Sequence, residues 1–193
     1  MGEIRLSFES SRLMGLVSTL LMVLVPIVYG IASGSLLLSN TSAEVNVYMV
    51  ITNSAIQIVV HIVFLKAMSG FAKYYDESKI YQNSLYAVIL GILATIISPI
   101  FTNVTNLLIP TFLNLVFAMI YATIFAILTG FFYREAFYAL AEKSGEKNLK
   151  HAGWLMFIGG ILTVIVIGVF VALLGRIFAF LGFYSMKPKA SEA

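Results

Sequence analysis

Long apolar runs separated by short charged segments make up almost the whole chain. Residues 13–43, 45–65 and 80–133 contain no Lys, Arg, Asp or Glu, and residues 152–186 contain one such residue. A helix needs about 20 apolar residues to cross a hydrocarbon core of about 30 Å. The pattern therefore predicts several transmembrane helices joined by short loops.

The run 80–133 is too long for one crossing, so we divide it at a turn marked by proline and asparagine between residues 99 and 110. The last apolar stretch forms either one helix of about 50 Å or two short spans. We predict an all-α, polytopic helical bundle in a single transmembrane domain, 1–193, with six spans and five as the alternative. The spans are placed at residues 13–38, 46–65, 83–101, 107–132, 152–168 and 169–186.

Composition supports lipid as the solvent for most of the chain. Hydrophobic residues make up 60% of the 193 residues and charged residues only 11%, whereas a soluble domain has about 25% charged residues. The chain has no cysteine, which excludes disulfides, thiolate catalysis and cysteine metal sites. The net charge of +3 comes from basic residues scattered through loops, so nucleic acid is not an expected partner.

The basic residues also predict an orientation. Lys and Arg occur in the N-terminal segment, in the segments 66–79 and 134–151, and in the tail, but not in the segment 39–44 or near residue 103. Basic loops stay on the cytoplasmic side of a membrane. With six spans, both termini are therefore expected in the cytoplasm of a cell carrying this multi-pass protein in its cell membrane.

The two basic segments resemble each other at an offset of 69 residues. Residues 72–80 align with residues 141–149, and the alignment continues without a gap to residues 91–93 over 160–162. One interpretation is a parallel internal repeat that pairs spans two and three with spans four and five, as in some transporter halves. The alternative is chance similarity between apolar helices.

The same segments carry a family resemblance. The stretch Phe131–Met186, which begins FFYREAFYALAEKSGEKNLKHAGWLMFIGGILT, and the stretch 65–93, LKAMSGFAKYYDESKIYQNSLYAVILGIL, are similar to a group of archaeal multi-span membrane proteins. That family is filed as a domain of unknown function. The resemblance implies an archaeal source and a membrane location, and it implies no activity, cofactor or catalytic residue.

Polar residues inside the predicted spans are few. Asn53, Gln57 and His61 recur every four residues and so share one helical face. In lipid such a stripe must face protein or water, because its donors and acceptors need partners. It is either a contact between helices, which we favour, or a polar path for a ligand. Asn114 in span four is a candidate partner.

The last apolar stretch holds one charge and a stripe of small residues. If this stretch is a hairpin, Arg176 lies deep and needs a partner; if it is one helix, Arg176 marks the outer interface. Small residues spaced by four and three allow two helices to approach closely. They are Gly168, Ala172, Gly175, Ala179 and Gly182, and span one contains Gly30-x-x-x-Gly34.

Enzyme signatures are missing from the sequence. All nine acidic residues fall in predicted loops or tails, and the chain contains no Gly-x-Ser-x-Gly, His-Glu-x-x-His or phosphate-loop motif. We therefore assign no catalytic, cofactor or metal residue, and take Asn40 as a candidate glycosylation site. The expected function is a non-enzymatic accessory or structural subunit of a membrane assembly, contacting lipid and either other subunits or further copies. The alternative is a transporter or channel for a small solute.

Overall fold

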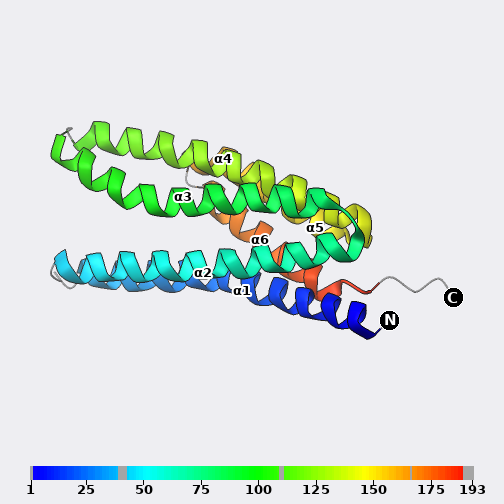
Figure 1. Cartoon of the computed structure of the whole chain (residues 1–193). Helices are drawn as coiled ribbons and strands as arrows, with labels where there is room; N and C mark the ends of the chain where they lie inside the picture. Colours follow the sequence, from blue (N-terminus) through cyan, green and yellow to red (C-terminus); the bar gives the residue numbers. More distant parts are fainter. Residues whose placement is uncertain (1, 39–42, 109–110, 166, 189–193) are drawn as a thin grey trace.

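The computed structural model describes residues 2–38, 43–108, 111–165 and 167–188, and within these ranges every regular element is helical. Four long helices of the described chain are followed by a shorter hairpin, as can be followed in Figure 1. The elements are α1 (Gly2–Leu38), α2 (Ala43–Tyr75), α3 (Ser78–Leu108), α4 (Thr111–Ser144), α5 (Lys147–Ile161), the 3₁₀ turn η1 (Leu162–Ile165) and α6 (Ile167–Ser185). Six of them contain a segment long and apolar enough to cross a membrane, so the predicted six-span, all-α bundle is confirmed.

The helices extend further than the predicted spans. The charged segments 66–79 and 134–151, expected as loops, are helical except for short turns at residues 76–77 and 145–146. Their Lys, Glu and Ala residues favour helix. One face of each extension is also buried, including Phe71 on α2 and Leu140 on α4. Charge therefore marks where the helices become polar, not where they end.

The packed core lies toward the end of the molecule where α1 begins and α6 ends (Figure 1). Aromatic rings from four helices meet there: Phe71 stacks on Phe183 at 5.6 Å between centroids, and Phe8 meets Phe71 edge-on at 5.8 Å. Phe137 approaches Phe183 at 6.1 Å. This core holds α1, α2, α4 and α6 together at what we call the inner end, the end of the two charged turns.

The α5–α6 hairpin is shorter than the helices around it (Figure 1). Near its tip, a Cβ added at Gly160 would overlap the carbonyl of Ala126 on α4, so these two positions lie at the same depth. Helix α4 starts at Thr111, 15 residues or about 22 Å further out. The outer ends of α3 and α4 therefore extend past the tip of this hairpin.

The 69-residue offset matches the positions of the structural elements. Helix α2 ends at Tyr75 and α4 at Ser144, and the next helices begin at Ser78 and Lys147. Each turn contains a residue with positive φ at the equivalent position, Asp76 at 51° and Gly145 at 77°. Four pairs of equivalent apolar residues are also fully buried: Ala67 with Ala136, Met68 with Phe137, Phe71 with Leu140, and Ile80 with Leu149.

Candidate functional site

Arg176 binds a backbone carbonyl that a proline has left without its helical donor. In an α-helix the N–H of residue 26 would bond to the carbonyl of residue 22, but residue 26 is Pro26 and has no N–H. The Arg176 guanidinium of α6 donates to that Met22 carbonyl oxygen at 2.9 Å. The arginine thus completes the hydrogen bonding of α1 from another helix, 154 residues away in the sequence.

Two polar side chains from α2 and α4 lie near this contact. His61 and Tyr133 are both within electrostatic range of Arg176. Tyr133 is only 7% exposed, and its hydroxyl has no hydrogen-bond partner among the described residues. Arg176 forms no ion pair among the described residues; its hydrogen bond is to the α1 carbonyl, and one polar side chain each from α2 and α4 lies nearby.

His61 has a defined orientation. Its Nδ1 lies 2.7 Å from the Gln57 carbonyl oxygen, and because that oxygen can only accept, Nδ1 donates. The opposite nitrogen, Nε2, faces Gly91 on α3, where an added Cβ would lie 3.0 Å from it. The small residue on α3 therefore makes room for the imidazole between the two helices.

The predicted polar stripe reaches further out along α2. Asn53 is partly buried, and its Oδ1 has no hydrogen-bond partner in the described part of the chain. Asn114 lies at a different depth. The rings of Phe64 on α2 and Tyr133 on α4 are in contact, with centroids 5.5 Å apart, so these two residues lie at the same depth in the bundle. Asn114 precedes Tyr133 by 19 residues and therefore lies about 28 Å further out along α4. Asn53 is only about 16 Å outward from Phe64. The structure does not bring these two asparagines together.

The small-residue stripe of α6 packs against α5 within the same chain. An added Cβ at Gly168 would overlap the Gly159 carbonyl, and one at Gly175 would lie 2.9 Å from the Met156 backbone nitrogen. At Gly182 it would meet the Leu149 side chain at 2.6 Å. Ala172 borders Gly159, and Ala179 is fully buried.

By contrast, Gly30 on α1 has nothing within 4 Å of an added Cβ. A separate feature is an apolar groove between the outer halves of α1 and α2, with a volume of about 470 Å³, whose lining does not include Gly30. Asn53, with its unpaired Oδ1, forms part of the wall. The groove is lined by Leu24, Val25, Val28, Tyr29, Ala32, Tyr48, Met49, Thr52, Asn53 and Ile56.

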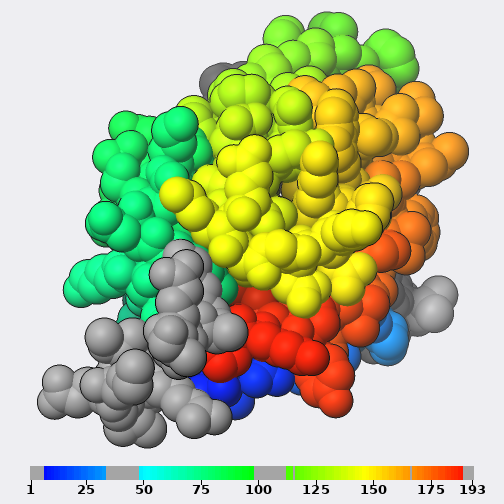
Figure 2. Space-filling model, turned by 90° about the vertical axis from the view of Figure 1, so that its right-hand side faces the viewer, coloured from blue at the N-terminus to red at the C-terminus, as the bar shows by residue number. Residues whose placement is uncertain are grey.

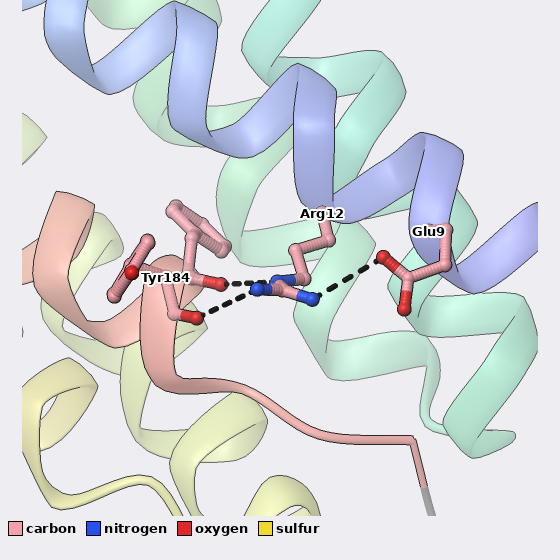
Figure 3. Close-up of polar contacts among 4 residues, drawn as sticks. Glu9, Arg12 and Tyr184 are labelled. Atoms are coloured by element: carbon pink, nitrogen blue, oxygen red, sulfur yellow. Dashed lines mark hydrogen bonds and ion pairs between the residues drawn. The ribbon is translucent and has the colours of Figure 1, made fainter.

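At the inner end, Arg12 joins the first helix to the last (Figure 3). Its Nε donates to the Phe183 carbonyl at 3.1 Å and one terminal nitrogen donates to the Tyr184 carbonyl at 2.9 Å. The other terminal nitrogen pairs with Glu9 at 3.2 Å. Both carbonyls belong to the last turn of α6, which has no helical donors for them, so Arg12 closes the C-terminus of that helix.

A second ion pair connects the two charged turns. Lys143 Nζ lies 3.2 Å from Glu77 Oε2. The hydrogen bond from Lys143 lowers the pKa of the Glu77 carboxyl below its ordinary value. This contact joins the turn after α2 to the end of α4, the equivalent place in the repeat.

No cluster of three metal-ligating side chains occurs in the ranges that the structure describes. The candidate glycosylation site, Asn40, lies outside those ranges. The sequence identified Arg176 and His61 but missed Tyr133 as their neighbour and Arg12 as a clamp. The internal repeat offered a signal for Tyr133. The 69-residue offset makes Tyr133 equivalent to Phe64, and the rings of these two residues are in contact.

Comparison with known proteins gives a family without an assigned activity. Residues 56–177 match a family model described as "Protein of unknown function (DUF996)". The chain is 21% identical over 159 residues to "Uncharacterized protein MJ1644" of Methanocaldococcus jannaschii, covering 77% of this chain and 89% of that protein. No solved structure matches. The resemblance to an archaeal family of unknown function is thus confirmed.

Proposed function

This chain belongs to the DUF996 family of proteins of unknown function, and we propose that it is a non-enzymatic accessory subunit of a membrane assembly. The observation that carries the proposal is the α1–α2 groove, which fits a transmembrane helix of a partner subunit. Helix association in lipid relies on close backbone approach at small residues and on interhelical hydrogen bonds. In the groove, Ala32 is a small residue of α1, and the Oδ1 of Asn53 is an acceptor without a partner among the described residues.

The use of the other polar and small residues supports the same proposal. The α6 stripe is occupied by α5, and Arg176 is engaged with the Met22 carbonyl. These features serve the internal packing of the bundle. The groove is apolar, and the Oδ1 of Asn53 in its wall has no partner in the described chain, so it is the place that we propose for a second polypeptide.

The absence of cysteine makes a direct test available, because one introduced cysteine is a unique attachment point. We would place a photoactivatable cross-linker on Val28→Cys, at a groove residue that is 63% exposed, in the native host membrane. The matched control is Ile124→Cys on α4, 51% exposed and outside the groove. We expect a product with one other membrane protein from position 28 and not from position 124.

Three results would overturn the accessory role. Lipid adducts alone from both positions would leave the groove without a protein partner. A product of twice the chain mass would make a second copy the occupant. Equal cross-linking to the same protein from both positions would show contact without preference for the groove.

A transporter for a small solute is the second candidate, because two equivalent hairpins meet at Phe64 and Tyr133, close to the polar group around Arg176. Parallel repeats with a polar site at their interface occur in transporters. Solute-dependent uptake into vesicles containing the purified chain, abolished by Arg176→Met but not by Arg12→Met, would favour this candidate over the accessory subunit.

A further inference from the structure

We propose that the α4–α5 face at the inner end binds the phosphate of a membrane phospholipid through Arg134 and Lys150, with the lipid tail lying along the apolar surface of α5. Figure 2 views the molecule from this end, with the yellow residues around the α4–α5 turn at the centre. The site is separate from the α1–α2 groove, so it does not depend on the proposed partner subunit.

Arg134 is held in place by aromatic rings. Its guanidinium carbon lies 4.4 Å from the centre of the Trp154 ring, 5.4 Å from that of Tyr138 and 5.6 Å from that of Phe157. The close approach of the two helices here depends on Gly153, where an added Cβ would lie 3.0 Å from the Arg134 Cα. The arginine is therefore pre-positioned, with little freedom to lose on binding.

A hydrogen-bond donor of this arginine is left unused. Its Nε is buried and has no partner among the described residues. Its contact with Glu135 is long, at 3.6 Å. A buried donor without an acceptor is unfavourable. The Arg134 side chain as a whole is 26% exposed, so a phosphate oxygen can approach its guanidinium from the surface. Guanidinium groups also match phosphate geometry better than ammonium groups do.

The second cation comes from α5. Lys150 Nζ lies 5.1 Å from the centre of the Tyr138 ring, so Tyr138 contacts both Arg134 and Lys150. A hollow of about 170 Å³ opens beside this ring. It is lined by Tyr138, Ala141, Glu142, Gly145, Glu146, Lys147 and Lys150.

Polarity changes along this face in the direction that a lipid requires. Lys147 and Lys150 stand near the turn, Arg134 and Trp154 follow, and exposed apolar side chains continue outward along α5 and α4, including Phe131, Ile158 and Ile161. Trp, Tyr and basic residues at a membrane boundary are typical contacts for lipid headgroups. The exposed apolar continuation favours a lipid phosphate over a free phosphate ion.

Two carboxylates line the hollow without occupying the phosphate position. Glu146 accepts a hydrogen bond from Ser185 Oγ at 2.8 Å, which ties it to α6. Glu142 lies eight residues from Arg134, about 12 Å along α4 toward the turn. The two carboxylates of the hollow therefore lie nearer the turn than Arg134 does, while Glu135 stands at the level of Arg134, with its carboxylate 3.6 Å from the guanidinium.

The test uses native mass spectrometry of the full chain with phosphatidylglycerol and, separately, with diacylglycerol of the same chains, which lacks phosphate. We expect wild-type protein to retain phosphatidylglycerol in preference to diacylglycerol. Arg134→Gln and Lys150→Gln should each weaken this binding about fivefold, the effect of one basic residue near a lipid surface. The matched control, Lys73→Gln, removes an exposed lysine on α2 and should leave binding unchanged.

Arg134→Lys keeps the charge and serves as the second variant if Arg134→Gln unfolds; it should retain more phosphatidylglycerol than Lys150→Gln does. Equal retention of the two lipids by wild-type protein would overturn the proposal, as would unchanged binding in both glutamine variants. An arm with inorganic phosphate alone distinguishes the source. If millimolar phosphate displaces the lipid completely, the site is one for free phosphate and the lipid assignment is wrong.

Discussion

The contact between Arg176 and the carbonyl freed by Pro26 predicts a specific coupling between these two residues. Arg176→Met removes the donor that reaches the Met22 carbonyl at 2.9 Å. Pro26→Ala restores the N–H that would satisfy the same carbonyl from within α1. Because either donor can satisfy the Met22 carbonyl, removing Arg176 should lower the free energy of unfolding less in the Pro26→Ala background than in the wild type.

The magnitude follows from the cost of an unmade hydrogen bond. A hydrogen bond from a charged donor is worth about 1.5–3 kcal/mol, and a buried carbonyl left unsatisfied costs about 1–3 kcal/mol. Arg176 is only partly buried and methionine keeps most of its packing, so we expect Arg176→Met to cost about 2 kcal/mol in the free energy of unfolding. In the Pro26→Ala background the cost should fall to about 1 kcal/mol, a coupling of about 1 kcal/mol.

The assay is a double-mutant cycle on the chain in mixed micelles, unfolded by an increasing fraction of denaturing detergent. The fluorescence of Trp154, the one tryptophan of the chain, reports the unfolding of the α4–α5 region. Far-ultraviolet circular dichroism follows the helices as a whole and checks that the transition is shared. Additive free-energy changes in the cycle would refute the reasoning, because they would mean that the arginine and the proline do not act on one carbonyl.

Three further predictions concern the packing of the bundle. Replacing Arg12 by Met should lower the free energy of unfolding by about 1–3 kcal/mol, since two last-turn carbonyls of α6 lose their donor; a detergent melt equal to wild type would contradict this. Gly175→Leu should cost more than about 2 kcal/mol because its Cβ meets the α5 backbone, whereas Gly30→Leu should change the melt of the isolated chain little. The pKa of Glu77 is lowered by Lys143, so the stability from this pair is present above the ordinary glutamate pKa and is lost as the pH falls through the lowered value. Acid titration of the melting temperature should show that loss in wild type and less of it in Glu77→Gln.

The number and type of spans could be predicted from the sequence because charge is costly in lipid. Each long uncharged run corresponds to one or two helices. The helix ends could not be predicted in the same way, since residues 66–75 and 134–144 are charged yet helical. At the inner end the helices carry charged residues, and propensity and packing decide the structure. There, burial of Phe71 and Leu140 extends the helices beyond the apolar run.

The existence of a break in the last apolar stretch could likewise be predicted from the sequence, but its position could not. The sequence predicted two spans divided between residues 168 and 169, and the structure places the break at η1, Leu162–Ile165. No polar residue marks a turn in this stretch, and the fifth predicted span ends at Gly168. In the structure it lies in the first turn of α6 and packs against Gly159. Glycine in a membrane helix often serves close packing, so its position alone could not locate the turn.

Arg176 and Pro26 illustrate why the site could be predicted only in part. Each was visible in the sequence, one as a charge and the other as a proline inside the first span, but only the fold brings Arg176 to the Met22 carbonyl, 154 residues away. This pairing also explains how the chain holds a cation in the bundle without a carboxylate beside it in the described residues. The guanidinium takes as its partner a carbonyl that the helix itself cannot satisfy, so each group reduces the cost of burying the other. A deep arginine is often the mark of a transport path, but here its best-defined contact completes the structure of α1, and this is why we rank the accessory subunit above the transporter.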